Sequence, residues 1–366
     1  MNKKETLDKV KNDFEKSVKY HMESDVPVGL FLSGGIDSTS ILTVASKFSK
    51  INTLSIGLEE KRWDESYTSK MIADYYGSNH YECIIKENDI VECLDDFVNT
   101  LDQPTVDGFN TYFISKFSNQ LGFKVVLSGL GGDELFGGYS SFLRMNIVNH
   151  GLNIKNNILP KRISKSLNRI SKSLIASKLL RKQESRIIDL IDSDNLFDSY
   201  IAIRGIFSKN EALNIMKEIS DNEINSLLDI NENSAGSDSI NSKTRTLELN
   251  NYLKNQLLRD SDIFGMRWST EIRTPFVDYN FVSIIKSLPE KYIFQKNKKA
   301  LTEALELPIH LMNTKKQGFS FPWQLWSKNY FGNEIKKEIP STMQNYTEWY
   351  KLWAIFVLKK WIKNNV

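Results

Sequence analysis

The feature that most constrains the fold is a short apolar run that ends abruptly in two glycines. Val26–Leu32 is rich in apolar residues, Ser33-Gly34-Gly35 interrupts it, and Ile36–Phe48 returns to helical character. This order predicts a strand, a tight loop and a helix, as in sheets whose parallel strands alternate with helices. Ligands of such sheets bind outside the carboxyl ends of the strands, where the backbone N–H groups of a glycine-rich turn can hold a phosphate.

A second apolar run leads into glycines in the same way. The expected strand Lys124–Ser128 is followed by Gly129-Leu130-Gly131-Gly132-Asp133. Because Asp37 follows the first loop in a similar manner, both carboxylates are expected at one edge of the sheet. A carboxylate beside phosphates requires a hard cation between them, so we predict that Asp37 and Asp133 bind one Mg²⁺.

The first 145 residues continue this alternation of strands and helices. Further strands are expected at Ile51–Ile56 and His80–Ile85, and helices at Thr6–His21, Ser66–Tyr76, Asp89–Leu101 and Phe109–Leu121. Later in the chain helical periodicity dominates, apart from a polar, glycine-containing loop at Asn222–Ser242. We therefore predict an α/β domain over residues 1–145, with a parallel sheet covered by helices on both faces. A mostly helical region over residues 146–366 is expected to complete the active site.

Composition and charge exclude several classes of protein. The 366 residues carry 48 Lys and Arg against 45 Asp and Glu, and this net charge of +3 argues against nucleic acid as the main partner. The apolar run Trp353–Leu358 is far shorter than the ~20 residues of a membrane-spanning helix. The charged segment Met1–Val10 shows no secretory signal, so we expect a cytoplasmic protein without a membrane span.

The two glycine loops and several later segments carry a family resemblance. Ser33–Ser38, which reads SGGIDS, fits neither the Walker A pattern nor GxGxxG, but it resembles the pyrophosphate loop of the N-type ATP pyrophosphatases. The second loop, Ser128–Tyr139, is similar to a hallmark of the synthetase domain of glutamine-dependent asparagine synthetases. Further segments match motifs of that family in the family's order: Asp64–Ser66, Leu101–Thr111, Leu258–Asp262, Glu271–Asp278 and Lys315–Phe319.

The resemblance implies a fold and a reaction. The fold is that of the adenine nucleotide alpha hydrolase-like ATP pyrophosphatases, and the enzyme is an asparagine synthase-type ligase of asparagine biosynthesis. A carboxylate, aspartate or a related one, attacks the α-phosphate of ATP and gives an acyl-adenylate and pyrophosphate. Ammonia or an amine then displaces AMP and forms the amide. The implied cofactors are ATP and Mg²⁺, and the implied partners are a small carboxylate and ammonia.

The resemblance also assigns roles to individual residues. The implied ATP and pyrophosphate ligands are Ser33, Gly34, Gly35, Asp37, Ser38, Ser128, Gly129 and Asp133, with the backbone of Phe31, Leu32 and Ile56 beside the adenosine. Lys316 matches the catalytic lysine, whose charge would stabilise negative charge that develops on the α-phosphate. The alternative for Lys316 is a solvated surface lysine. Glu271 is either the base of the amine step or the partner of Arg273 in an ion pair, and Arg273 and Asp278 are implied substrate ligands.

Three departures from the family leave the acceptor and the amine source open. The chain starts with Met1 and shows no N-terminal glutaminase domain, so ammonia is expected from solution or from a separate glutaminase subunit, unless an amine on another molecule attacks. Leu130 stands where many relatives carry a glutamate that assists the amine step. Gly265–Trp268 contains larger side chains than the relatives do, which either reshapes the acceptor pocket or only alters packing.

Two further patterns and the choice of function also stay open. Residues 151–183 hold nine Lys or Arg and no acid, which indicates contact with tRNA, an acidic partner or an anionic membrane, or a solvated helix face. Trp349, Trp353, Phe356 and Trp361 recur at helical spacing, as in a core or a homodimer interface. The leading hypothesis is the amide ligase. The alternatives are amidation of a larger acceptor, such as a uronic acid in surface polysaccharide synthesis or a peptide carboxylate, a non-catalytic nucleotide-binding subunit, and a tRNA-modifying pyrophosphatase.

Overall fold

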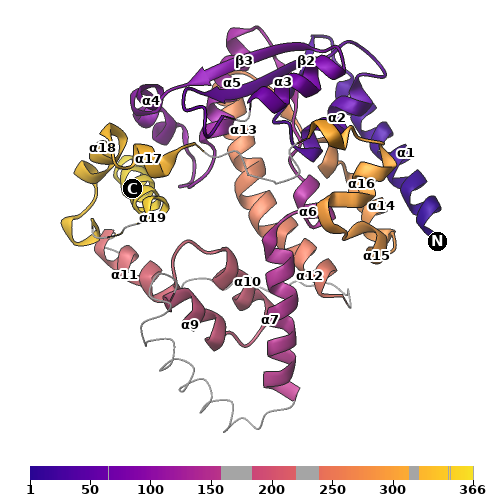
Figure 1. Ribbon diagram of the computed structural model, residues 1–366. Helices are drawn as coiled ribbons and strands as arrows, with labels where there is room; N and C mark the ends of the chain where they lie inside the picture. The colour runs from indigo at the N-terminus through magenta and orange to yellow at the C-terminus, as the bar shows by residue number, and fades with distance from the viewer. Residues whose placement is uncertain are drawn as a thin grey trace. The chain divides into compact units, whose positions relative to one another are not determined.

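The computed structural model describes residues 1–64, 66–157, 184–219, 239–312, 321–344, 346 and 348–365 (Figure 1). These residues form two compact units. The first comprises Met1–Gly138 together with Leu249–Val366, and the second comprises Tyr139–Glu248. The division predicted near residue 145 lies close to the first of these boundaries. The chain after Leu249, however, packs with the sheet instead of forming a separate helical region.

The first unit is built on a five-stranded parallel sheet, which confirms the predicted fold class. Its strands are β1 (Val28–Phe31), β2 (Asn52–Leu58), β3 (Asn79–Ile85), β4 (Val125–Leu127) and β5 (Glu271–Arg273), and their spatial order is β3-β2-β1-β4-β5. The order of strands reverses between β1 and β4. Open α/β sheets bind their ligands at such a switch point, outside the carboxyl ends of the strands.

Helices cover both faces of this sheet. The helices of its first half are α1 (Lys3–Met22), α2 (Ile36–Ala45), α3 (Ser66–Tyr75), α4 (Glu87–Thr100), α5 (Phe109–Gln120) and the short α6 (Gly132–Phe136). On one face, Leu30 of β1 and Leu127 of β4 join a core with Phe14 of α1. On the other face, Val126 of β4 packs with Ile114 of α5. Side chains that alternate along each strand therefore fill two separate apolar layers.

The chain returns to the first unit after Glu248. It forms a π-helix (Glu248–Leu257), α13 (Leu258–Arg267), α14 (Tyr279–Ser287), α15 (Glu290–Ile293), α16 (Lys299–Ala304), α17 (Trp323–Trp326), α18 (Tyr330–Glu338) and α19 (Trp349–Asn365), with 3-10 turns at Pro275–Val277, Lys296–Lys298, Ile309–Leu311 and Ser341–Met343. α14 and α16 pack against α1 (Figure 1). α18 and α19 pack against α4.

The C-terminal aromatic stripe packs within the chain. Trp353 is buried, and its Nε1 donates a hydrogen bond to the carbonyl of Val106 at 3.2 Å. Trp361 Nε1 donates in the same way to the carbonyl of Leu101 at 3.0 Å. α19 is therefore hydrogen-bonded to the loop between α4 and α5. Trp353 and Phe356 are buried in the core of the first unit.

The second unit is helical in the part that the structure describes. Its helices are α7 (Ser140–Asn157), α9 (Glu184–Asp192), α10 (Leu196–Arg204), α11 (Lys209–Ile219) and α12 (Ile240–Leu247). Glu248 is fully buried and accepts hydrogen bonds from Arg204 Nη2 at 2.5 Å, from Tyr200 Oη at 3.2 Å and from Ser141. A buried carboxylate paired in this way fixes α7 and α10 relative to each other. Most of the basic segment 151–183 and of the predicted loop at 222–242 lies outside the described residues.

None of the described helices combines the length and the apolar character that crossing a bilayer requires.

Candidate active site

The first glycine loop joins β1 to α2. Gly34 has a φ of 73°, and a Cβ at this position would lie 2.9 Å from Thr68 Cγ2, so only glycine fits without displacement. Ser38 Oγ accepts a hydrogen bond from Ser33 N at 3.2 Å and lies 3.2 Å from Ser33 Oγ. Gly35 is the N-cap of α2 and has no side chain to cover the first N–H groups of the helix. This helix N-terminus, flanked by two hydroxyls, suits a phosphate.

The second glycine loop packs directly against Asp37 of the first. A Cβ on Gly129 would lie 3.0 Å from Asp37 Cβ, and a Cβ on Gly132 would lie 2.3 Å from Asp37 Oδ1. Gly131 has a φ of 97° and turns the chain into α6. Two loops that are remote in sequence therefore meet at the switch point between β1 and β4, and the glycines are what permits so close an approach.

A buried lysine lies between the two predicted metal ligands. Lys298 Nζ is 2.5 Å from Asp37 Oδ1 and 2.5 Å from Asp133 Oδ1, and its side chain is only 4% exposed. Burial alone lowers the pKa of Lys298, but the charges of Asp37 and Asp133 and their hydrogen bonds outweigh it, so the pKa lies above its ordinary value. The structure thus brings Asp37 and Asp133 together and supplies the charge that compensates them.

Lys298 is the site residue that the sequence analysis missed. Its neighbours Lys296 and Lys299 are exposed, so the segment reads as a solvated basic run and no local pattern distinguishes Lys298. The distinguishing feature is conformational, since Asn297 and Lys298 have φ values of 57° and 49°. Left-handed backbone costs roughly 1–2 kcal/mol for each non-glycine residue, and such strain concentrates at functional sites. Here the left-handed backbone occurs in the turn that places the Lys298 side chain next to Asp37 and Asp133.

Asp37 and Asp133 supply donor atoms of the kind that Mg²⁺ binds. One oxygen of each carboxylate lies 2.5 Å from the same nitrogen, so the two oxygens are at most twice that distance apart. One ion with Mg–O bonds of about 2.0–2.1 Å needs the two oxygens within about 4 Å of each other, which is a narrower condition than this limit. Within the described ranges, no group of three His, Cys, Asp or Glu side chains is placed to bind a metal. Nucleotide sites commonly hold Mg²⁺ with one or two carboxylates, the phosphates and water.

The predicted adenosine site lies at the neighbouring strand ends. Phe31 ends β1 and pairs with Leu54 of β2, and Leu32 N donates a hydrogen bond to the carbonyl of Leu54 at 2.8 Å. Ile56 lies further along β2, next to β3. The backbone of Phe31, Leu32 and Ile56 therefore follows the same carboxyl edge as the phosphate loop, and their role beside adenosine stays a prediction.

Glu271 and Arg273 lie at the two ends of β5. The Arg273 carbonyl accepts a hydrogen bond from Ser128 N, the first residue of the second glycine loop, at 2.8 Å. Arg273 Nε donates a hydrogen bond to Glu271 Oε1 at 2.8 Å, and Arg273 Nη1 donates to the carbonyls of His21 and Glu23 at 2.9 and 2.7 Å. Glu23 immediately follows α1 and precedes β1, so the guanidinium group contacts the chain at the end of α1. The ion pair, one of the two alternatives for Glu271, is formed. These hydrogen bonds give both side chains a structural role, and their predicted contact with substrate stays a prediction.

Asp278 caps a helix. Its Oδ1 accepts hydrogen bonds from Asn280 N at 2.9 Å and from Phe281 N at 3.0 Å, at the beginning of α14. An aspartate at this position satisfies N–H groups that have no partner within the helix. The structure therefore accounts for Asp278 without a substrate.

The cap can be separated from the predicted substrate contact. Because asparagine caps a helix about as well as aspartate, capping alone predicts that Asp278→Asn changes the free energy of unfolding by less than about 0.5 kcal/mol. The same account predicts a KM for the carboxylate within about twofold of that of the unmodified protein. Urea denaturation and steady-state kinetics measure the two quantities. A tenfold higher KM at unchanged stability would instead show that Asp278 binds substrate.

The unusual stretch Gly265–Trp268 packs on the helices beside it. Arg267 Nη2 lies 2.6 Å from Asp96 Oδ1 of α4. The Trp268 ring lies 5.5 Å from the Tyr112 ring of α5. These residues precede β5 and so lie toward the amino edge of the sheet, which supports altered packing over a reshaped pocket. Lys316, the predicted catalytic lysine, lies outside the described residues.

A buried carboxyl group outside the glycine loops belongs to Asp260 of α13, which contacts the loop that precedes α5. Asp260 is 3% exposed, and its Oδ2 accepts a hydrogen bond from Thr105 Oγ1 at 2.8 Å. Burial raises the pKa of Asp260 to about 7 from its ordinary value of 3.8. The Thr105 hydrogen bond opposes this rise, and the charges of Asp107 and Asp102 add to it.

This pKa predicts a pH-dependent stability. Between pH values of about 4 and 7 the folded chain keeps a proton on Asp260 that the unfolded chain has lost, so the free energy of unfolding falls as the pH rises. The slope is at most about 1.4 kcal/mol per pH unit, and the contribution levels off above about pH 7. Asp260→Asn is expected to remove it, as measured by urea denaturation at several pH values. Asp262→Asn, at an exposed position of the same helix, is the matched control and keeps the slope. An unchanged slope in Asp260→Asn would refute the assignment.

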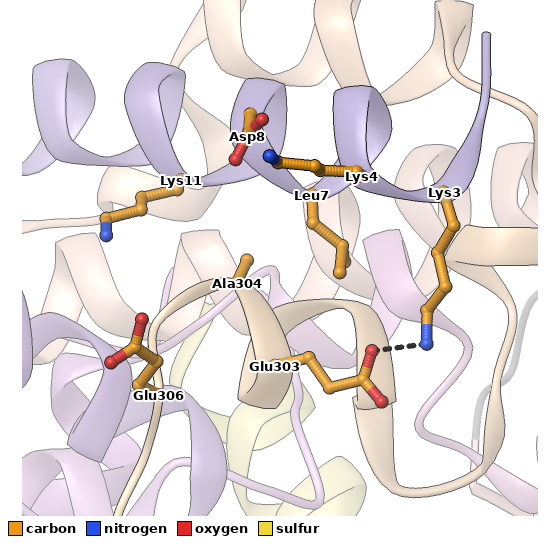
Figure 2. A pocket seen from close by; sticks show the side chains of 8 residues that line it. All are labelled: Lys3, Lys4, Leu7, Asp8, Lys11, Glu303, Ala304 and Glu306. Atoms are coloured by element: carbon orange, nitrogen blue, oxygen red, sulfur yellow. Dashed lines mark ion pairs between the residues drawn. The ribbon is translucent and has the colours of Figure 1, made fainter.

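A surface groove elsewhere in the first unit does not compete with this site. It has a volume of about 370 Å³ and is lined by Lys3, Lys4, Leu7, Asp8, Lys11, Glu303, Ala304 and Glu306 (Figure 2). Lys3 Nζ of α1 and Glu303 Oε2 of α16 form an ion pair at 2.6 Å across it. Its side chains of opposite charge face one another, and none of the predicted site residues lines it.

Comparison with known proteins agrees with the geometry. Residues 9–350 match the sequence model of the asparagine synthase family. The chain is 32% identical over 346 residues to asparagine synthetase [glutamine-hydrolyzing] 1 of Bacillus subtilis, covering 90% of this chain and 52% of the relative. It is 36% identical over 148 residues to asparagine synthetase [glutamine-hydrolyzing] 3 of Arabidopsis thaliana, covering 36% of this chain and 25% of that protein. The chain thus spans about half the length of the Bacillus relative. Because the family match extends over nearly the whole chain and includes both glycine loops, the chain belongs to the asparagine synthase family.

Proposed function

We propose that the chain is an ATP-dependent amide ligase that activates a carboxylate as an acyl-adenylate, releases pyrophosphate and then transfers ammonia or an amine. The observation that carries the proposal is the convergence of Asp37, Asp133 and Lys298 where the two glycine loops meet. A loop open to phosphate and paired carboxylates suited to Mg²⁺ match the requirements of cleaving ATP between its α and β phosphates. Membership in the asparagine synthase family supports an ATP-dependent ligase that forms C–N bonds.

The described residues suggest how the nucleotide is held. Ser33, Ser38 and the N-terminus of α2 would bind the polyphosphate through hydroxyl and N–H donors. Asp37 and Asp133 would hold Mg²⁺, which when bound neutralises charge on the departing pyrophosphate. Lys298 Nζ, already at this point, would add a second positive charge near the phosphates.

Aspartate is the proposed acceptor. Amidation of a larger carboxylate was favoured only by the Gly265–Trp268 stretch. Arg267 and Trp268 contact α4 and α5, so packing accounts for these large side chains and supports the smaller acceptor. The paired carboxylates also argue against a non-catalytic nucleotide-binding subunit, since burying them beside a lysine without a functional gain is costly. The relatives are named glutamine-hydrolyzing, which supports glutamine, or ammonia released from it, as the nitrogen source.

The proposal is tested by the products of ATP. Purified protein is incubated with ATP, Mg²⁺, an ammonium salt and either aspartate, glutamate or a uronic acid, and the nucleotide products are separated. We expect AMP and pyrophosphate in equal amounts, formed fastest with aspartate. ADP and phosphate as products, or a rate independent of the carboxylate, would contradict the ligase assignment. Faster turnover with the uronic acid would retain the ligase and change its acceptor.

A further inference from the structure

The position between Asp37 and Asp133 is filled by an ammonium group of the chain itself. Lys298 Nζ contacts both carboxylates, with Oδ1 of each at 2.5 Å. Two carboxylates this close repel each other strongly in a partly buried site, and a cation between them is what makes the arrangement stable. The backbone at Asn297 and Lys298 adopts the left-handed conformation in the turn that delivers this side chain.

The second glycine loop packs closely around this point. A Cβ on Gly138 would lie 1.8 Å from Asp133 Oδ1 and 2.8 Å from Lys298 Cε. A Cβ on Gly132 would lie 2.3 Å from Asp37 Oδ1. The second glycine loop therefore encloses the three charged groups closely. A Mg²⁺ ion bound to both carboxylates at about 2.0–2.1 Å would occupy the region of Nζ, and two positive charges cannot share it.

We propose that Lys298 is a positioning residue that holds Asp37 and Asp133 in the geometry of the metal site and excludes free divalent metal until phosphates arrive. Anionic phosphate oxygens then give the ammonium group a new partner beside the loop, and the carboxylates become available to the metal. The metal therefore binds together with the phosphates and only weakly without them. This inference rests on the proposed function in one respect: the proposed function places the phosphates at this edge of the sheet.

The test measures binding of Mn²⁺ as a probe, without turnover. Protein is mixed with Mn²⁺ alone or with Mn²⁺ and inorganic pyrophosphate, and the metal retained with the protein after rapid ultrafiltration is counted. The variants are Lys298→Met, which removes the charge at similar length, and Lys299→Met, an adjacent exposed lysine that pairs with Glu303 and serves as the matched control. The folded fraction of each variant is checked by circular dichroism.

Without pyrophosphate, we expect Lys298→Met to bind one Mn²⁺ at least about tenfold more tightly than the unmodified protein, because the ammonium group that lies between the two carboxylates is then absent. Lys299→Met is expected to bind like the unmodified protein. Pyrophosphate is expected to increase Mn²⁺ retention by the unmodified protein at least about tenfold. Mn²⁺ is also expected to raise the Tm of Lys298→Met more than that of the unmodified protein.

Equal Mn²⁺ affinity of the unmodified protein and Lys298→Met would overturn the proposal. So would tight binding of one Mn²⁺ at this site by the unmodified protein without pyrophosphate, a measurement that decides the matter even where Lys298→Met does not fold. These results are independent of the ligase assignment. A protein that cleaves ATP as proposed but binds free Mn²⁺ tightly would refute this inference alone, and a protein without ATP turnover that shows the expected Mn²⁺ behaviour would refute the proposed function alone.

Discussion

Asp133→Asn is expected to lower the rate of pyrophosphate release from ATP by about 10³-fold. Asparagine keeps the size of the side chain, so Gly138 and the second loop can retain their close packing around it. It lacks the negative charge that a metal ligand at this position needs, and it removes one of the two carboxylates that contact Lys298. We therefore expect a slower chemical step and weaker metal-dependent binding. The first unit is expected to stay folded.

The control is the same substitution at an exposed carboxylate. Asp74 lies on α3, and 62% of its side chain is exposed. Asp74→Asn is expected to keep the rate of the unmodified protein within about twofold, since surface substitutions of this kind have small effects. Pyrophosphate release is followed with a coupled assay, and circular dichroism verifies folding. A rate for Asp133→Asn within tenfold of that of the unmodified protein would show that the site is not formed by the convergence of the two loops.

Lys316→Ala is expected to produce the second large loss, about 10²- to 10³-fold in kcat, because an oriented positive charge that stabilises the transition state contributes on this scale. The prediction rests on the match of Lys315–Phe319 to the family motif. The described residues on either side, Met312 and Phe321, are both buried in the first unit, which carries the glycine loops.

Separating binding from chemistry makes this prediction specific. The Kd of ATP, measured by equilibrium titration, is expected to change less than about tenfold in Lys316→Ala, while kcat falls. Lys328→Ala removes an exposed lysine that follows α17 and is expected to leave both quantities unchanged. Equal kcat in Lys316→Ala and Lys328→Ala would support the alternative of a solvated surface lysine.

Local patterns were sufficient to predict most of the sheet. β1, β2, β3 and β4 and the helices α1 to α5 lie where apolar runs, glycines and helical spacing predicted them, because each of these segments has a distinct pattern of its own. β5 was missed. Glu271–Arg273 has only three residues, and its strand conformation depends on backbone hydrogen bonds with β4, such as Glu271 N to the carbonyl of Lys124 at 2.8 Å. A pattern of three side chains is too short to predict a strand.

The candidate site was predictable only where its residues lie in glycine-rich motifs. Asp37 and Asp133 each follow a strand and a glycine loop, so their meeting at one edge follows from the rule for parallel sheets. Lys298 belongs to a short lysine-rich turn and reaches the site through folding of the chain over 261 residues of separation, which no local signal encodes. The roles of Lys316, Glu271, Arg273 and Asp278 stay predictions, although the ion pair of Glu271 and the cap formed by Asp278 explain those residues structurally.

The formation of an acyl-adenylate at the two loops is tested most directly by oxygen transfer. Aspartate labelled with ¹⁸O in its side-chain carboxylate is incubated with the protein, ATP, Mg²⁺ and ammonium, and the AMP is analysed by mass spectrometry. Attack of the carboxylate on the α-phosphate followed by displacement of AMP moves one labelled oxygen into AMP. We predict AMP that carries one ¹⁸O for each amide formed, whereas amide formation with unlabelled AMP, or with ADP as the product, would contradict the account.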